Sequence, residues 1–171
     1  TDAASEEYSR FLHAFLPVLA AFLKEEGVWE KSFFHVSDEP RPNQMESYRN
    51  ASRLLRDCLP GCRSIDALSE YEFYEQGLVQ TPIPGSEALQ EFADNKVSPL
   101  WTYYCCSEGN EVSNRFFAMP SARNRIMGIQ LFKYDITGFL QWGYNFYYSQ
   151  LCTEKINPWL TTDAGNAFPS G

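Results

Sequence analysis

The chain has 171 residues, of which 44% are hydrophobic and 16% aromatic, so it suits a single folded domain with a sizeable core and is not a disordered chain. Its 14 basic and 22 acidic residues give a net charge of −8, and the basic residues form no runs. Nucleic acid and anionic membrane surfaces are therefore not expected as partners.

Helices and short strands are predicted to alternate along the chain. Ser5, with acidic residues in the following turn, begins an amphipathic helix whose apolar face includes Phe11, Phe15 and Phe22 and which ends at Gly27. In chain order we expect a helix at 5–27, a strand at 32–37, a helix at 42–59, strands at 63–67 and 78–83, a helix at 85–95, a strand at 99–106, a helix at 120–135 and a strand at 138–146. Residues 70–76 are ambiguous, and residues 149–171 are expected to be loop-like.

This alternation is typical of an α/β fold, in which right-handed crossovers build a parallel sheet with helices outside it. No internal repeat or linker divides the chain, so residues 1–171 are expected to form one domain. Five strands are too few for a closed barrel of eight strands, which usually takes about 250 residues. The pattern therefore fits part of a barrel or an open sheet, and uncovered sheet edges would favour self-association into a homo-oligomer.

Two adjacent acids stand at the end of the strand at 32–37. Apolar Phe33, Phe34 and Val36 predict a strand that is buried on both faces, and Asp38 and Glu39 follow it before a proline. Ligands of such sheets bind beyond the carboxyl ends of the strands, which makes the pair a candidate active site. The alternative is that Asp38 caps the next helix and Glu39 interacts with its amino end.

Cysteine usage and membrane signals bear on the compartment. The number of cysteines, five, is odd, and they lack the paired CxxC spacing of a zinc site, so they are expected to be free thiols in a reducing compartment. No stretch approaches the roughly 20 apolar residues of a membrane span, and the first residues do not resemble a signal peptide. A cytoplasmic location without a membrane partner is therefore favoured.

Five segments together carry a resemblance to a known family. They are the Phe-Phe-His-Val-Ser-Asp-Glu-Pro strand end at 33–40, the Leu-Trp-Thr-Tyr-Tyr-Cys-Cys strand at 100–106, Asn-Arg-Phe at 114–116, Gly-Phe-Leu-Gln-Trp-Gly-Tyr-Asn at 138–145 and Asn-Pro-Trp at 157–159. In this order they resemble the bacterial domain of unknown function 4091, which is related to the catalytic domain of glycoside hydrolase family 123, the β-N-acetylgalactosaminidases. The resemblance implies the C-terminal part of a TIM-like (β/α)8 barrel, with about five parallel strands and outer helices, within a longer chain.

The resemblance also implies a reaction. Asp38 and Glu39 match the adjacent acids of the family, which works by substrate assistance, so that the 2-acetamido oxygen of the sugar attacks its own anomeric carbon. Asp38 would orient the acetamido group and stabilise the positive charge, and Glu39 would protonate the leaving oxygen and later activate water. The expected function is retaining hydrolysis of N-acetylhexosaminides, above all β-N-acetylgalactosaminides, with no metal and no organic cofactor.

Other strand ends would complete the pocket. Trp101 and Trp142 are candidates for stacking on a pyranose, and Tyr103 and Asn145 for hydrogen bonds to the sugar, although all four could equally belong to a barrel core. Two other functions remain open at this point. One is a carbohydrate-binding or scaffold barrel without turnover, and the other is an unrelated α/β protein whose acidic pair holds a divalent cation.

Overall fold

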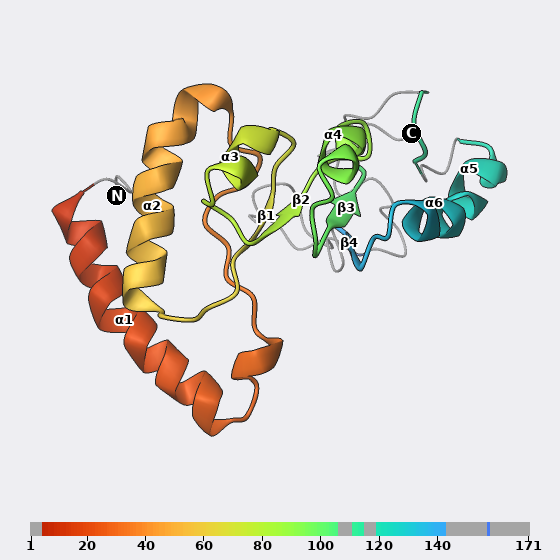
Figure 1. The fold of residues 1–171 in the computed structure, drawn as a ribbon. Coiled ribbons are helices and arrows are strands. Elements are labelled where there is room, and N and C mark those ends of the chain that lie inside the picture. Colours follow the sequence, from red (N-terminus) through yellow and green to blue (C-terminus); the bar gives the residue numbers. More distant parts are fainter. Residues whose placement is uncertain (1–4, 106–110, 115–118, 143–156, 158–171) are drawn as a thin grey trace.

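The computed structural model describes residues 5–105, 111–114, 119–142 and 157, and shows short parallel strands between helices (Figure 1). The predicted mixed α/β fold is confirmed. In chain order the elements are α1 (Glu6–Glu25), η1 (Trp29–Lys31), η2 (Pro42–Gln44), α2 (Met45–Cys58), β1 (Ile65–Ala67), α3 (Tyr71–Glu75), β2 (Thr81–Ile83), α4 (Leu89–Asp94), β3 (Trp101–Tyr103), α5 (Ser121–Arg125), α6 (Met127–Lys133) and β4 (Gly138–Leu140).

The strands pair in parallel and in chain order. β1 pairs with β2 so that Ile65 lies beside Thr81, and β3 pairs with β4 so that Trp101 lies beside Gly138. Two isolated parallel bridges continue this order. Phe34 pairs with Ser64, just before β1, and Gly85, just after β2, pairs with Tyr103 of β3. Because all these pairings are parallel, the carboxyl ends of the strands face the same edge.

The segment at 32–37 is not the regular strand that the apolar run predicts. Only Phe34 pairs with the neighbouring strand: its N–H donates to Arg63 O at 2.9 Å, and its carbonyl accepts from Ile65 N at 3.0 Å. The prediction of burial on both faces was wrong for Phe33, which is 42% exposed. The segment leaves the ladder after Phe34, and the N–H groups of Val36 and Ser37 bond the Asp66 side chain instead of a strand.

Helices α1 and α2 lie side by side at one end of the molecule (Figure 1). The Ser5 side chain caps α1 by accepting from Tyr8 N at 3.2 Å, as its sequence predicts. The face of α1 that is buried carries Leu16 and Ala20, whereas Phe11 is 57% exposed. The prediction was therefore wrong for the phenylalanines, because Leu16 and Ala20 pack against the end of α2 instead.

The main core lies between α2, the strands and the short helices α3 and α4. The ambiguous stretch at 70–76 contains helix α3, and its Phe73 is fully buried, as is Phe92 of α4. The buried side chains of this cluster are Tyr48, Leu68, Phe73, Leu78, Val79, Leu89, Phe92, Val97 and Leu100. This core fixes the positions of the loops that follow β1 and β2, where the candidate site lies.

The C-terminal part of the described chain differs in one detail from the prediction. The helix expected at 120–135 is two consecutive helices, α5 and α6, and Ile126 caps the end of the first and the start of the second. In the parts of the chain that are described, Cys58 and Cys62 are free thiols. No described helix is both long enough and apolar enough to cross a bilayer. Self-association stays a prediction.

Two glycines, one in β4 and one in α6, allow a matched test of the packing. A Cβ atom on Gly138 would lie 2.1 Å from ring atoms of Trp101, whereas one on Gly128, within α6, meets nothing within 4 Å. We expect Gly138→Ala to lower the free energy of unfolding by about 1–3 kcal/mol through overpacking. Gly128→Ala should raise it by about 0.5–1 kcal/mol, because alanine favours the helix.

Urea denaturation of the two variants measures both effects. Equal stability of Gly138→Ala and the unchanged protein would contradict the close approach of Trp101 to β4.

Candidate active site at the carboxyl edge of the strands

The acidic pair lies at the edge where the strands end. Glu39 N donates to the carbonyl of Ala67, the last residue of β1, at 2.8 Å. The Glu39 backbone has φ +44°, in the left-handed region that residues with a side chain rarely adopt. Such a backbone costs about 1–2 kcal/mol, and conformations of this kind gather at functional sites. The side chains of Asp38 and Glu39 are both exposed.

A buried carboxylate on β1 holds the segment that leads into the pair. Asp66 is 1% exposed, and its Oδ1 accepts hydrogen bonds from Val36 N at 2.9 Å and from Ser37 N at 3.2 Å. Its Oδ2 accepts from the Tyr48 hydroxyl of α2 at 2.5 Å. His35 Nδ1 also contacts Oδ1. Asp66 therefore joins β1, α2 and the residues just before the acidic pair.

Burial and hydrogen bonding act in opposite directions on Asp66. Burial raises the pKa of the Asp66 carboxyl above its usual value, while the hydrogen bonds from Tyr48, Val36 and Ser37 and the nearby His35 partly lower it. Burial, followed by the Asp66 charge, raises the pKa of the Tyr48 hydroxyl, so that Tyr48 remains the donor of this bond.

A pocket of about 220 Å³ opens beside Glu39. The hydroxyl of Tyr103, from the end of β3, donates to Glu39 Oε1. Glu39 is thus held by β1 through its backbone and by β3 through its carboxylate. The lining residues come from the ends of several strands and are Glu39, Pro40, Arg41, Ser69, Glu70, Glu87 and Tyr103.

The structure brings together only some of the site residues expected from sequence. Glu39 and Tyr103 share the pocket, but Asp38 is not among its lining residues and makes no side-chain hydrogen bond with the described residues. Trp101 packs on Phe33, with ring centroids 5.4 Å apart, and lies against Gly138.

The two remaining candidates lie further along the chain. Trp142, just past β4, is 53% exposed. Asn145 lies outside the described residues, so its predicted role stays a prediction.

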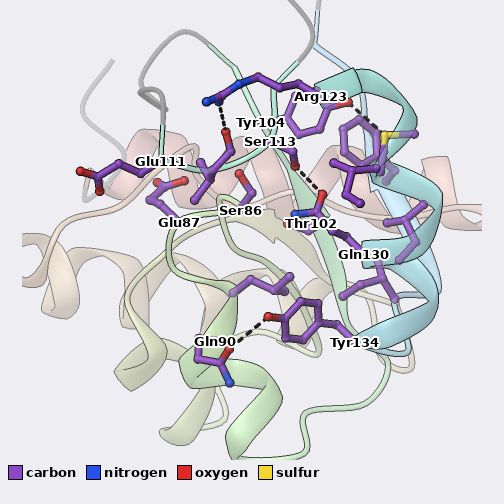
Figure 2. A pocket seen from close by; sticks show the side chains of 17 residues that line it. Ser86, Glu87, Gln90, Thr102, Tyr104, Glu111, Ser113, Arg123, Gln130 and Tyr134 are labelled. Carbon is purple, nitrogen blue, oxygen red and sulfur yellow. Dashed lines mark hydrogen bonds between the residues drawn. The ribbon is translucent and has the colours of Figure 1, made fainter. Parts of the chain in front are cut away.

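A second, larger pocket of about 450 Å³ lies between β3, α4 and α6. Figure 2 shows polar side chains from both sides of this pocket directed toward one another. The hydroxyl of Tyr134, just after α6, donates to Gln90 Oε1 of α4 at 3.1 Å, and Ser113 donates to Gln130. Glu87 lines this pocket as well as the one beside Glu39. Both pockets therefore border the loop that follows β2.

Sequence reasoning missed Asp66 and Glu87. The available signal for Asp66 was a single acid within an apolar strand, Ser-Ile-Asp-Ala-Leu at 64–68, because such a buried charge needs partners. Glu87 has no local signal, since it is one of many acids in helix-forming stretches. Among the described residues there is no group of three or more His, Cys, Asp or Glu side chains that could hold a metal ion.

Parallel strands that end at a pocket lined by carboxylates and a tyrosine define an α/β domain with a candidate hydrolytic site. Residues 1–171 match the family described as "Glycoside hydrolase 123, catalytic domain". The chain belongs to this family. No curated protein matches the chain. The resemblance to glycoside hydrolase family 123 is therefore confirmed, and a carbohydrate substrate follows from the class.

Replacement of Tyr48 tests the anchoring by Asp66. Tyr48→Phe removes one donor to a buried carboxylate and should lower the free energy of unfolding by about 1.5–3 kcal/mol. Because the Tyr48 bond lowers the pKa of Asp66, its loss should raise that pKa further. A carboxyl pKa raised by folding means that the native state binds more protons, so stability falls as pH rises from the unfolded to the folded pKa.

We therefore expect the fall of stability with rising pH to extend to higher pH in Tyr48→Phe than in the unchanged protein. Urea midpoints across pH, with an NMR titration of the Asp66 carboxyl carbon, measure both effects. Tyr71→Phe, which removes a hydroxyl that bonds no described residue, is the control. An unchanged pKa of Asp66 in Tyr48→Phe would contradict the hydrogen bond from Tyr48 to Asp66.

Proposed function

We propose that this domain hydrolyses β-linked N-acetylhexosaminides, in particular N-acetylgalactosaminides, by substrate assistance and with retention at the anomeric carbon. The observation that carries the proposal is Glu39, which lines a pocket at the carboxyl edge and accepts a hydrogen bond from Tyr103. We also propose that residues 1–171 form one domain that has the topology of part of a TIM-like (β/α)8 barrel. Parallel strands that neighbour one another in chain order support that topology.

The proposed reaction has two steps. In the first, the carbonyl oxygen of the substrate's acetamido group bonds to the anomeric carbon as the glycosidic bond breaks, and Glu39 gives its proton to the leaving oxygen. In the second, Glu39 takes a proton from water as the water oxygen bonds to the anomeric carbon. The bond from that carbon to the acetamido oxygen breaks, which opens the oxazolinium ring and restores the starting configuration. Tyr103 limits the rotation of the Glu39 carboxyl group, because its hydroxyl binds one of the two oxygens.

Asp38 would hold the acetamido N–H and stabilise the positive charge of the intermediate. Its side chain is exposed and bonds no described residue, so it can rotate toward a bound sugar without breaking a hydrogen bond. Asp38 does not line the pocket beside Glu39. This favours a second candidate function, a carbohydrate-binding or scaffold domain without turnover.

Neutralising Glu39 tests its role as the acid. We expect Glu39→Gln to lower kcat/KM, which reports the cleavage step, by at least about 100-fold on an alkyl 2-acetamido glycoside, whose poor leaving group needs a proton. The loss should be much smaller on a dinitrophenyl glycoside, whose leaving group departs as an anion. Glu70→Gln is the matched control, because it removes another carboxylate from the same pocket and should cost less than about tenfold.

Equal losses on both substrates, or equal losses in the two variants, would exclude Glu39 as the acid.

Asp38→Asn separates the enzyme from the binding domain. A chromogenic N-acetylgalactosaminide should be cleaved by the unchanged protein and at least about 100-fold more slowly by Asp38→Asn, since an amide supplies no charge to the intermediate. Calorimetric binding of N-acetylgalactosamine to both proteins is the companion measurement. Binding without release of the chromophore by the unchanged protein would favour the domain without turnover.

A further inference from the structure

Glu87 lines the pocket beside Glu39 but has no part in the proposed proton transfer. The two acids reach this pocket from opposite sides of the end of β1. On one side, Glu39 N donates to Ala67 O at 2.8 Å, and on the other, Leu68 N donates to Ile83 O of β2 at 3.1 Å. Because neighbouring strands are about 4.8 Å apart, about two such spacings separate the backbone of Glu39 from the loop that carries Glu87. A sugar ring in the pocket would therefore meet the two acids on different sides.

The backbone of the loop that carries Glu87 is fixed from both sides. Gly85 N donates to Ser69 Oγ at 3.0 Å, which ties the loop to the end of β1. Ser86 N donates to Tyr103 O at 2.9 Å, which ties it to the end of β3. Residues that bind a ligand precisely need such support, because a mobile loop would lose freedom when the ligand binds. Glu87 thus starts from a rigid position.

Gly85 leaves room for the Glu87 carboxylate. A Cβ atom on Gly85 would lie 2.5 Å from both Oε1 and Oε2 of Glu87, so the carboxylate occupies the space that a side chain at position 85 would fill. Gly85 is not among the glycines with positive φ, so its backbone conformation does not require glycine. The position of the Glu87 carboxylate is therefore what excludes a larger residue at 85.

The chemistry of a carboxylate indicates what it binds in this pocket. An ionised carboxylate only accepts hydrogen bonds, and its two oxygens can accept from two adjacent hydroxyl groups. In the proposed reaction the anomeric carbon lies beside Glu39, and Asp38 holds the acetamido group at C2. The hydroxyl groups at C3 and C4 are then an adjacent pair on the part of the ring that faces away from Glu39.

We propose that Glu87 is a substrate-binding residue, whose carboxylate accepts hydrogen bonds from the hydroxyl groups at C3 and C4 of the N-acetylhexosamine beside Glu39. This inference rests on the proposed function and adds to it a residue outside the acidic pair. It also gives Gly85 a role, because this glycine leaves the space that the carboxylate needs.

Sugars that lack one hydroxyl group test which groups Glu87 binds. By calorimetry, N-acetylgalactosamine without its 3- or 4-hydroxyl group should bind the unchanged protein about tenfold more weakly than the complete sugar. Glu87→Ala should weaken binding of the complete sugar by about tenfold or more, and removal of either hydroxyl group should then cost little further. Glu91→Ala is the matched control, because it removes an exposed acid of α4 that does not line the pocket.

A second variant moves the carboxylate without removing it. The new Cβ atom of Gly85→Ala meets only the flexible end of Glu87, so this variant should fold with a urea midpoint close to that of the unchanged protein. It should bind N-acetylgalactosamine about as weakly as Glu87→Ala does, and the variant with both changes should be no weaker than either alone. Gly128→Ala, where a Cβ meets nothing within 4 Å, is the control and should not change binding.

These measurements separate the inference from the proposed function, because binding needs no turnover. If the sugar binds but no glycoside is hydrolysed, the proposed function fails, and the loss of binding in Glu87→Ala still supports Glu87 as the residue that holds the hydroxyl pair. The inference is overturned if Glu87→Ala binds N-acetylgalactosamine as tightly as Glu91→Ala does. It is also overturned if removal of the hydroxyl groups weakens binding to Glu87→Ala as much as binding to the unchanged protein.

Discussion

The candidate site depends on the buried carboxylate of Asp66. Backbone N–H groups near the core must find acceptors, and those of Val36 and Ser37 have no strand partner, because the ladder ends at Phe34. Asp66 accepts both bonds and thus does for this segment what a neighbouring strand would do. It also accepts from Tyr48, so the path of the segment is tied to the position of α2. Desolvation of Asp66 is costly, and these donors offset part of that cost.

This anchoring places Glu39. Two residues after the Asp66 bonds the chain turns through a left-handed conformation, and the Glu39 N–H reaches the end of β1. The Glu39 carboxylate then meets the Tyr103 hydroxyl on β3. A side chain held at both its backbone and its tip loses little further freedom when a substrate binds, which is the preorganisation that catalysis requires. Asp38 has no such restraint, and its exposed side chain can follow the ligand.

The arrangement of the two pockets has a simple origin. Short parallel strands that end at one edge place their following loops side by side, and the loop after β2 lies between the end of β1 and the end of β3. Glu87 on that loop can therefore reach both faces of the sheet. The close approach of its carboxylate to Gly85 leaves no room for a Cβ there unless Glu87 moves, since such an atom would lie 2.5 Å from the carboxylate oxygens.

The sequence by itself determined the class of fold, the family, the helix that Ser5 begins and the place of Asp38 and Glu39 at the end of an apolar segment. These depend on local signals: caps, hydrophobic periodicity and short motifs. The tertiary structure decided which face of α1 is buried, why residues 36 and 37 leave the ladder, and which side chains meet Glu39. The hydrogen bond from Tyr103 to Glu39 joins residues 64 positions apart in the sequence. The hydrogen bond from Tyr48 to Asp66 joins a helix and a strand, and neither local sequence indicates the other as its partner. Such contacts follow from how strands and helices pack in space, and periodicity along the chain carries no information about them.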